Sequence, residues 1–431
     1  MIRRPKTQWI ALGLLTIVFN TLLVLVVIPK VSSRIGGLYN ANHFADGYDQ
    51  LAENLAAGNG YRFFPDTART LMREPGYPTL LAGVYTVFGK GFTAVELTNV
   101  LLALGTACLI ICLARKLSSR RLVIFGAPLL FLFHPETLLA ETRGGVEILF
   151  AFMLTLFMLS VYRAFKSSQW WDYLLSGAVL GLTVLVRSTP VLFPFLLLAY
   201  LLLCVSRQNQ RLSTLRNVAA MMLAMLGALS PWIIRNYTLT NKFVPTASVL
   251  GISAQSGLYL STHQAIGNAL LDTEAFWERN QLAWKLGYHF KPGYYQYFYS
   301  SSDELEFSNF LFHRTVREYE AHPLLFLKAV GLNMLKFWCG GKTWKSTILS
   351  GALQFPVLAL ATLGLVYSAK DGRLREVAPL ALLIAYLVAV SVPILAQARY
   401  SQPLIPFLSI LACMAIVKIR QAPELVGSQS K

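Results

Sequence analysis

The feature that most constrains the fold of this chain is a series of apolar runs of roughly bilayer-spanning length. An α-helix of about 20 apolar residues crosses the hydrocarbon core and satisfies its own backbone hydrogen bonds there. The clear runs lie near residues 9–29, 93–114, 122–140, 145–162, 172–187, 189–205, 217–235, 348–368, 377–395 and 402–418. The sequence therefore predicts an all-α polytopic membrane protein.

The composition agrees with a membrane protein and argues against a nucleic-acid partner. Hydrophobic residues make up 55% of the 431 residues and charged residues only 14%, against about 25% charged residues in a typical soluble domain. The net charge is +17, but many of the basic residues lie beside predicted spans, as in the inner loops of membrane proteins. The five cysteines have neither metal-ligand spacing nor the pattern of a disulfide framework.

Two further apolar stretches, 76–89 and 322–338, decide the topology. The first is short for a span, and the second contains Lys328 and Lys336, which are costly at the bilayer centre. If the N-terminus is inside and both stretches lie in the membrane plane, every inner loop is basic, as the positive-inside rule requires. We therefore expect about ten spans plus two amphipathic interfacial helices. An even number of extra spans would preserve the topology. The expected range is about 10–13 transmembrane helices.

This topology divides the chain into three parts and places both termini in the cytoplasm. An N-terminal transmembrane module, 1–235, carries a first outer loop at 31–92. A second outer region, 236–347, is rich in aromatic residues ("GYHFKPGYYQYFYS"), and such a composition predicts a folded element and not a disordered linker. Residues 348–431 form the C-terminal transmembrane helices and a cytoplasmic tail.

The first outer loop holds an unusual concentration of charge directly after the first span. "DQLAENLAAGNG" predicts a short helix with Leu51, Ala52 and Leu55 on one side, ending near Gly58 or Gly60. Asp46 and Asp49 lie at the start of this helix, where the helix dipole favours anions. The alternative is a capped interfacial helix with its carboxylates in water.

Six segments stand out by their order and their placement relative to the spans: "DGYDQLAENLAAGNGY", "REPGYPTLLAGVYTVFG", "HPETLLAETRGGVEILF", "GLTVLVRSTPVL", "SPWIIRNYTLTNKFVPTAS" and "ARYSQPLIPFL". Together they resemble the GT-C type integral-membrane glycosyltransferases. The most similar branch contains the protein O-mannosyltransferases and the aminoarabinose transferase of lipid A. The resemblance runs from about residue 40 to residue 410. It implies a GT-C fold that transfers a sugar from a polyprenyl-phosphate carrier to a hydroxyl or phosphate of a glycan, lipid or protein. Transfer would invert the anomeric carbon at the outer face of a bacterial plasma (inner) membrane.

The resemblance also assigns catalytic carboxylates to the first outer loop. Asp46 corresponds to the acidic residue that acts as the base, with Asp49 as a reserve candidate. Glu74 matches a second charged position before the amphipathic segment. The chemistry agrees, because transfer to a hydroxyl needs a carboxylate that accepts the proton as the new bond forms.

The departing lipid phosphate needs cations, since negative charge grows there in the transition state. Arginine suits phosphate oxygens, and Arg73, Arg187, Arg235 and Arg399 lie at the outer ends of predicted spans. Each of these arginines could instead be an interfacial anchor. The expected site-lining residues are Tyr48, Tyr77, His134, Glu147 and Tyr400.

No cofactor is firmly indicated. The six histidines lack zinc-protease spacing, but a divalent ion held by Asp46, Asp49 or Glu74 stays an open alternative, since carboxylates suit Mg²⁺ or Mn²⁺. A transporter or flippase of lipid-linked sugars, and a polysaccharide polymerase or ligase, are the alternative functions. A transporter would be expected to show repeated halves and charges near the bilayer midplane, whereas these charges cluster near the outer face.

Overall fold

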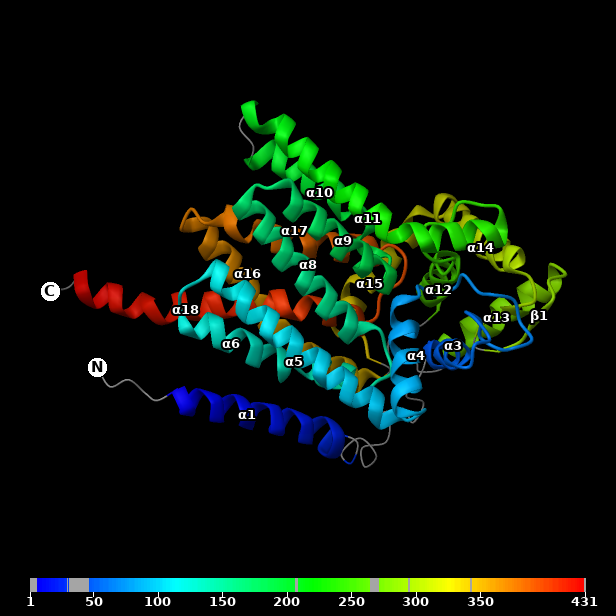
Figure 1. Cartoon of the computed structure of the whole chain (residues 1–431), viewed down its shortest axis with the longest axis horizontal. Helices are drawn as coiled ribbons and strands as arrows, with labels where there is room; N and C mark the ends of the chain where they lie inside the picture. The colour runs from blue at the N-terminus through cyan, green and yellow to red at the C-terminus, as the bar shows by residue number, and fades with distance from the viewer. Residues whose placement is uncertain are drawn as a thin grey trace.

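The computed structural model describes residues 6–28, 30, 46–205, 208–263, 271–293, 295–341 and 343–429. Residues 31–45, which begin the first predicted outer loop and include His43, lie outside this part. Helices dominate the described chain (Figure 1). In order, the elements of the first half are α1 (Lys6–Leu22), η1 (Leu23–Val27), α3 (Tyr48–Ala56), α4 (Gly76–Phe88), α5 (Phe92–Leu117), α6 (Arg121–Leu132), α7 (Pro135–Glu141), α8 (Glu147–Ser167), α9 (Trp170–Val186), η2 (Thr189–Leu192), α10 (Phe193–Tyr200) and η3 (Leu201–Val205).

The second half of the chain adds one short hairpin to the helices. Its elements are η4 (Gln208–Gln210), α11 (Arg211–Thr240), α12 (Leu250–Thr262), α13 (Leu271–Lys285), β1 (Phe290–Lys291), β2 (Tyr297–Phe298), α14 (Ser301–Ala321), α15 (Pro323–Cys339), α16 (Trp344–Lys370), α17 (Leu374–Ser391), η5 (Ala398–Tyr400), η6 (Gln402–Leu404) and α18 (Ile405–Gln429). The two strands pair antiparallel, with Phe290 opposite Phe298.

The predicted membrane spans are helical. In the described part of the chain, six helices are long and apolar enough to cross a bilayer: Phe92–Leu117, Glu147–Ser167, Gln208–Thr240, Trp344–Lys370, Leu374–Ser391 and Ala398–Gln421. The bent pair α6 and α7 would make a seventh, and Leu15–Val27, Trp170–Val186 and Thr189–Val205 are shorter apolar helices. Each predicted span coincides with one of these helices, which confirms the all-α polytopic membrane fold.

One predicted span, 122–140, is broken. The chain bends by 53° between α6 and α7, where His134 caps the second helix and Pro135 is its first residue. Proline has no backbone N–H to continue the hydrogen bonds of α6, and its ring disfavours a helical residue before it. The composition of the run predicted a span, but Pro135 at the start of α7 sets the bend.

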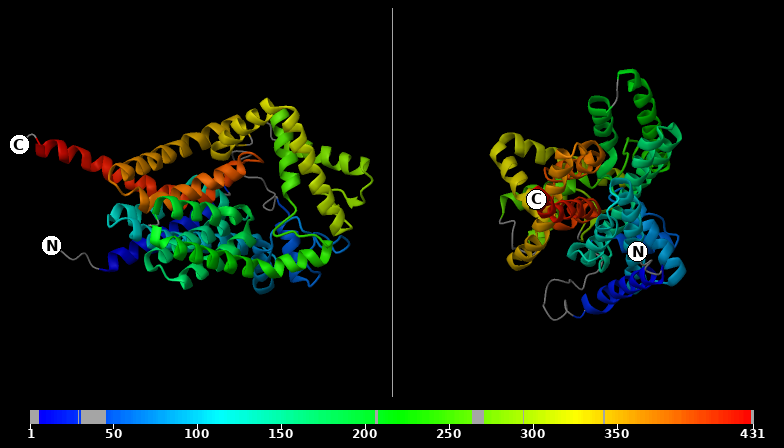
Figure 2. Two further views of the ribbon diagram at one scale, coloured as in Figure 1. Left: turned by 90° about the horizontal axis from the view of Figure 1, so that it is seen from above. Right: turned by 90° about the vertical axis from the view of Figure 1, so that its left-hand side faces the viewer.

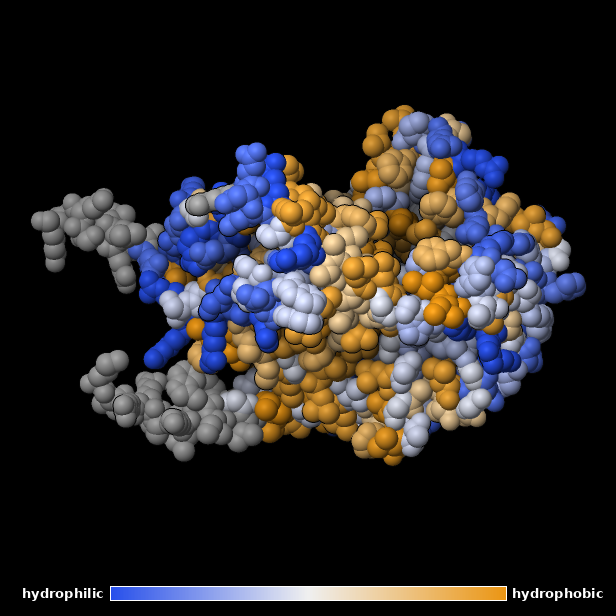
Figure 3. All heavy atoms as spheres, turned by 45° about the horizontal axis from the view of Figure 1, so that its top comes forward, coloured by the Kyte–Doolittle hydropathy of each residue, from blue (hydrophilic) through white to orange (hydrophobic). Residues whose placement is uncertain are grey.

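The molecule has two distinct ends. The start of α1 and the end of α18 lie on the left of Figure 1, whereas α3, α12, α13 and β1 lie on the right. Figure 2 shows the same separation from above. A band of hydrophobic side chains lies between two ends that are richer in hydrophilic residues (Figure 3). The two undecided apolar stretches form α4 and α15, and α4 runs across the direction of α6 and α18 in Figure 1, as expected for a helix along the membrane surface.

Close helix contact in the bundle depends on small residues. A Cβ atom at Gly177 of α9 would lie 2.0 Å from the carbonyl oxygen of Met221 in α11, and one at Gly181 would lie 2.6 Å from the Cβ of Ala228. Two glycines four residues apart let helix backbones approach closely in membranes, where van der Waals packing and not hydrophobicity drives association. The spacing therefore fixes α9 against α11, and α9 leads directly into Arg187.

The aromatic segment folds back onto the first loop. Phe290, Tyr297 and Phe298 are buried together with Tyr61 and Phe63. The Phe63 and Tyr297 ring centroids are 5.0 Å apart. Burial of these aromatic side chains stabilises the end of the molecule that lies outside the helix bundle. Because Tyr61 and Phe63 belong to this core, the loop that contains them is held in a fixed position.

Candidate active site

Asp46 stands immediately before α3, at a turn that requires glycine. Gly47 has φ of +73°, a left-handed conformation that costs other residues free energy, and a Cβ there would meet the Phe63 ring at 2.6 Å. Leu51 and Ala52 of α3 are fully buried, as the amphipathic pattern predicted. The helix is thus anchored by its apolar face, and the Asp46 side chain in front of it is only 12% exposed.

Arg399 reaches Asp46 from the other end of the chain. Its Nη1 donates to Asp46 Oδ2 at 2.6 Å and its Nη2 to Asp46 Oδ1 at 3.4 Å. Arg399 Nε donates to Gln397 Oε1 at 2.8 Å and lies 3.6 Å from Glu147 Oε1. A planar guanidinium that contacts both carboxylate oxygens is fixed in orientation as well as position.

Arg73 approaches the same carboxylate from the loop before α4. Its Nη2 lies 3.5 Å from Asp46 Oδ1, and its Nε donates to the Asp46 backbone carbonyl at 3.3 Å. The guanidinium lies over the rings of Tyr295 and Tyr48, 4.8 and 5.4 Å from their centroids. Such cation–π contacts stabilise a partly desolvated cation.

Tyr295 is the member of this cluster that the sequence analysis missed. Its hydroxyl donates to Asp46 Oδ1 at 3.2 Å and also contacts Arg73 Nη2. The residue lies two positions before β2, inside a run of aromatic residues, and is 4% exposed. The aromatic run was recognised as a folded element, but nothing in its spacing distinguishes this tyrosine from its neighbours.

The arginines control the charge of Asp46. Burial alone would raise the pKa of its carboxyl, but the positive charges of Arg399 and Arg73, with the hydrogen bonds from Arg399 and Tyr295, hold that pKa well below its ordinary value. Burial raises the pKa of the neighbouring Tyr48 hydroxyl. Asp46 is therefore an anion and Tyr48 a neutral phenol at neutral pH.

A family comparison bears on what this cluster serves. Residues 73–234 match the family model described as dolichyl-phosphate-mannose-protein mannosyltransferase. The predicted resemblance to GT-C glycosyltransferases is confirmed. The match indicates an integral membrane glycosyltransferase, a class that uses a lipid-linked sugar donor and an acceptor. The comparison with curated proteins found no match. The matched range includes Arg73 but neither Asp46 nor Arg399.

Asp46, Arg73, Arg399 and Tyr295 form what we call the Asp46 cluster. Glu74 follows Arg73 in the chain, but its side chain has a different partner. Its Oε1 accepts a hydrogen bond from the backbone N–H of Ser188 at 3.0 Å. The Tyr61 hydroxyl donates to the backbone carbonyls of Arg73 and Glu74, each at 3.0 Å. Glu74 thereby joins the loop that carries Arg73 to the end of α9, next to Arg187.

The two remaining predicted arginines, Arg187 and Arg235, pack against different aromatic rings. Arg187 stacks on Tyr400, 4.1 Å from the ring centroid, and Tyr400 is also 5.8 Å from the Arg399 guanidinium. The Tyr400 ring therefore contacts the guanidinium groups of both Arg187 and Arg399. Arg235 instead lies 4.4 Å from the Trp232 ring and donates to Asn236 Oδ1 at 2.9 Å. Within the described residues, no contact joins Arg235 to Asp46.

Three other predicted residues occupy separate positions. Tyr77 is buried and packs edge-on against Tyr48, with centroids 5.3 Å apart. His134 accepts from the backbone N–H of Glu136 at the start of α7. Asp49 lies in the first turn of α3, where the nearby charges are those of Glu53 and Lys90. Asp49 thus stands apart from the arginines that hold Asp46.

No group of residues in the described part of the chain has the arrangement of a metal site. Asp49 and Glu74 have partners of their own, and Asp46 is engaged by two guanidinium groups. A divalent ion at Asp46 would have to displace or lie beside the guanidinium groups of Arg73 and Arg399, which already neutralise this carboxylate.

The buried carboxylate of Glu304 fixes the loop that carries Arg73. Glu304, in the first turn of α14, accepts from Thr70 Oγ1 at 2.6 Å, from the Leu71 backbone N–H at 2.8 Å and from Ser248 Oγ at 2.8 Å. Burial raises the pKa of Glu304. Glu304 and Ser248 thereby hold residues 70–72 in place, directly before Arg73.

Proposed function

We propose that this protein transfers a sugar from a polyprenyl-phosphate-linked donor to an acceptor hydroxyl or phosphate at the outer face of the membrane, with inversion at the anomeric carbon. The observation that supports this proposal best is the contact of Asp46 with both Arg73 and Arg399. A carboxylate beside two guanidinium groups supplies the base and the phosphate-binding charge that the reaction needs.

The proposed chemistry assigns one task to each charge. The acceptor hydroxyl gives its proton to Asp46 as its oxygen forms a bond to the anomeric carbon. The bond from that carbon to the carrier phosphate breaks, and its electron pair stays on the phosphate oxygen. Arg399 and Arg73 stabilise the charge that grows there, and Arg187 extends the cationic surface past Tyr400. Attack opposite to the departing phosphate inverts the anomeric carbon.

Donor binding and proton transfer are coupled in this arrangement. Both oxygens of Asp46 are held by arginines, so the carboxylate without substrate is a weak base. A donor phosphate competes for the same guanidinium groups because Arg binds phosphate and carboxylate with the same fork of N–H donors. Phosphate binding would therefore weaken the hold on Asp46 and increase its basicity when the acceptor is present.

The proposed orientation follows from charge. Lys and Arg lie in the loops at the end of the molecule where α18 ends: Arg120 and Arg373 line a cavity there together with Lys418 of α18. By the positive-inside rule that end faces the cytoplasm. The Asp46 cluster lies at the other end, which we assign to the outer face of a bacterial plasma membrane. The acceptor, whether glycan, lipid or protein, would approach from there.

Asp46→Asn in the purified protein tests the proposal. We expect transfer from a polyprenyl-phosphate-linked sugar to fall by about two to four orders of magnitude, while binding of the carrier lipid is retained. Asp49→Asn is the matched control, since it makes the same change three residues away. Equal transfer by Asp46→Asn and wild type would refute the role of Asp46 as base. Movement of the lipid-linked sugar across vesicles without any transfer would favour a flippase.

A further inference from the structure

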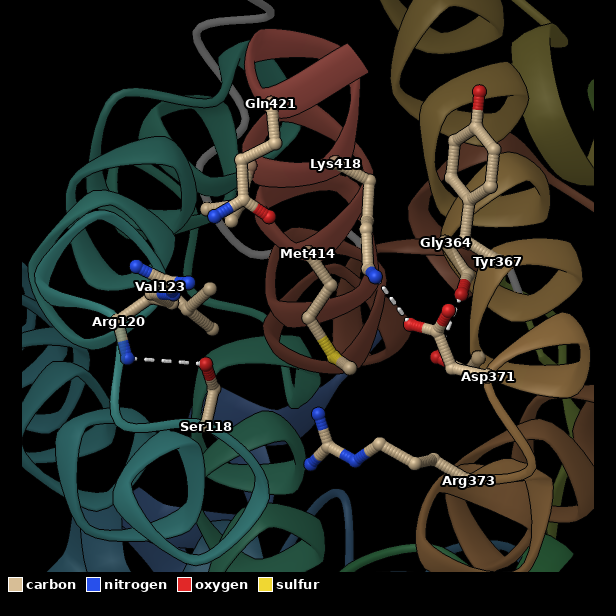
Figure 4. A pocket seen from close by; sticks show the side chains of 12 residues that line it. Ser118, Arg120, Val123, Gly364, Tyr367, Asp371, Arg373, Met414, Lys418 and Gln421 are labelled. Carbon is tan, nitrogen blue, oxygen red and sulfur yellow. Dashed lines mark hydrogen bonds and ion pairs between the residues drawn. The ribbon is translucent and has the colours of Figure 1, made fainter. Parts of the chain in front are cut away.

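A cavity of about 280 Å³ lies at the end of the molecule remote from Asp46. It is bounded by the α5–α6 connection, by the α16–α17 turn and by α18 (Figure 4). Its lining combines cations, hydroxyl groups and apolar side chains: Ser118, Arg120, Val123, Gly364, Tyr367, Ser368, Asp371, Arg373, Met414, Val417, Lys418 and Gln421. No step of the proposed sugar transfer uses this cavity.

The cations around the cavity exceed the anions. Lys418 Nζ is 2.6 Å from Asp371 Oδ2, and Figure 4 shows this pair on one side of the cavity. Arg120 lies on the opposite side, and no carboxylate in the described part of the chain forms an ion pair with its side chain. The cavity thus retains positive charge that an anion could neutralise.

Arg373 forms part of the framework of the cavity. Its Nη2 donates to the Leu117 carbonyl at 2.6 Å and to Glu376 Oε2 at 2.6 Å. It therefore ties the α16–α17 turn to the end of α5. This bond holds the walls of the cavity at a fixed separation.

Exposed apolar side chains lie on two of the helices that line the cavity. Gly364, which lines it, allows α16 to contact α18, because a Cβ there would lie 2.1 Å from the Leu411 carbonyl oxygen. Leu363 and Val366, on either side of Gly364 in the chain, are exposed on α16, as is Leu129 on α6. The cavity is therefore polar and cationic, with apolar helix surfaces beside it on which hydrocarbon chains can lie.

We propose that this cavity binds the phosphate headgroup of an anionic membrane lipid, with the acyl chains along α16 and α6. Arg120 and Lys418 contact the phosphate oxygens, and the hydroxyl of Ser118 completes the donor set. A lipid fits better than a soluble phosphate because the charged lining is continuous with exposed apolar surface. The lipid would also link α5–α6, α16–α17 and α18, and so stabilise the bundle.

Lipid binding to the detergent-purified full chain tests this site. The probes are phosphatidylglycerol, phosphatidylcholine of the same chains, and glycerol phosphate, with melting temperature and native mass spectrometry as readouts. Arg120→Gln removes a cation that has no carboxylate partner in the described chain, so its fold should survive. Arg121→Gln is the control, because Arg121 is equally basic and exposed but does not line the cavity.

We expect phosphatidylglycerol to bind and to stabilise the wild type and Arg121→Gln. In Arg120→Gln its affinity should fall by about tenfold, the typical effect of losing one charge-assisted hydrogen bond. Equal loss in both variants, or equal binding of phosphatidylcholine, would refute a specific anionic-lipid site. Binding of glycerol phosphate as strong as that of the lipid would replace the lipid with a soluble phosphate.

Discussion

Arg399 Nη1 and Asp46 Oδ2 lie 2.6 Å apart although 353 positions separate the two residues in the sequence. The pair joins the loop before α18 to the loop before α3. Neither residue lies in the range matched by the family model. The contact therefore brings together two ends of the chain at the point where carboxylate and guanidinium chemistry would be combined.

Removing the charge of Arg399 should impair transfer more than it impairs folding. We expect Arg399→Gln to lower the transfer rate by about 10²–10³-fold, as for loss of one donor to a developing anion. Arg399→Lys should recover only part of the activity, since an ammonium cannot form the same two-pronged contact. The assay is sugar transfer at saturating donor. Arg314→Gln, which breaks an ion pair with Glu278, is the control, and a similar loss there would contradict the assignment.

The Tyr295 hydroxyl can be tested without disturbing the aromatic cluster. Tyr295→Phe removes the hydrogen bond to Asp46 Oδ1 but keeps the ring beneath Arg73. We expect a loss of about five- to tenfold in the transfer rate, the size expected for one hydrogen bond to a charged group, with little change in melting temperature. Tyr297→Phe, two residues on in the same cluster, should leave transfer unchanged. A larger loss of transfer in Tyr297→Phe than in Tyr295→Phe would contradict the role assigned to the Tyr295 hydroxyl.

The depressed pKa of Asp46 predicts a specific pH dependence of stability. A carboxyl whose folded pKa lies below its unfolded value stabilises the fold above the unfolded pKa and loses this effect as the pH falls towards the folded pKa. The stability of wild type relative to Asp46→Asn should therefore be constant from about pH 5 to 8 and decrease below about pH 4, near the ordinary aspartate pKa. Melting temperatures of both proteins across this range provide the measurement. A difference that already declines between neutral pH and pH 5 would argue against the ion pairs.

Glu304 should contribute to stability through the loop that it holds. Glu304→Ala removes the acceptor of three hydrogen bonds and leaves buried donors unpaired, so we expect a loss of about 2–4 kcal/mol. Glu306→Ala, two residues along α14, breaks only an exposed ion pair with Lys242 and should cost less than about 1 kcal/mol. Denaturation monitored by tryptophan fluorescence compares the two variants. Equal effects would show that Glu304 does not anchor the loop.

The sequence was sufficient to predict the helices because each span is a long local signal. The short helix with Leu51 and Ala52 buried was likewise predicted from the spacing of its apolar residues. The break at Pro135 was not predicted, although a proline in an apolar run carries that information. Local apolar patterns thus indicated where helices form. The apolar composition of the run 122–140 did not reveal the bend between α6 and α7.

The candidate site was predicted only in part, because its residues meet through long-range contacts. Asp46 was assigned by the family resemblance, and Arg73, Arg399 and Glu147 were chosen by charge and position; the structure brings all four together. Arg235 was chosen on the same grounds but packs on Trp232. Tyr295 was missed because its role depends on a hairpin that folds back onto the first loop. A lone sequence does not reveal which of several arginines contacts a given acid.

The position of Arg399 also has a consequence for biogenesis. Helices α5 to α11 can insert and pack as the ribosome delivers them, but Asp46 acquires its main counterion only when the loop after α17 has emerged. A nascent chain that stalls before this point has only Arg73 beside Asp46 and lacks Arg399 of the proposed phosphate site. The proposed transfer would thus begin only after α17 and the loop that follows it have been synthesised, so partly synthesised chains would stay inactive.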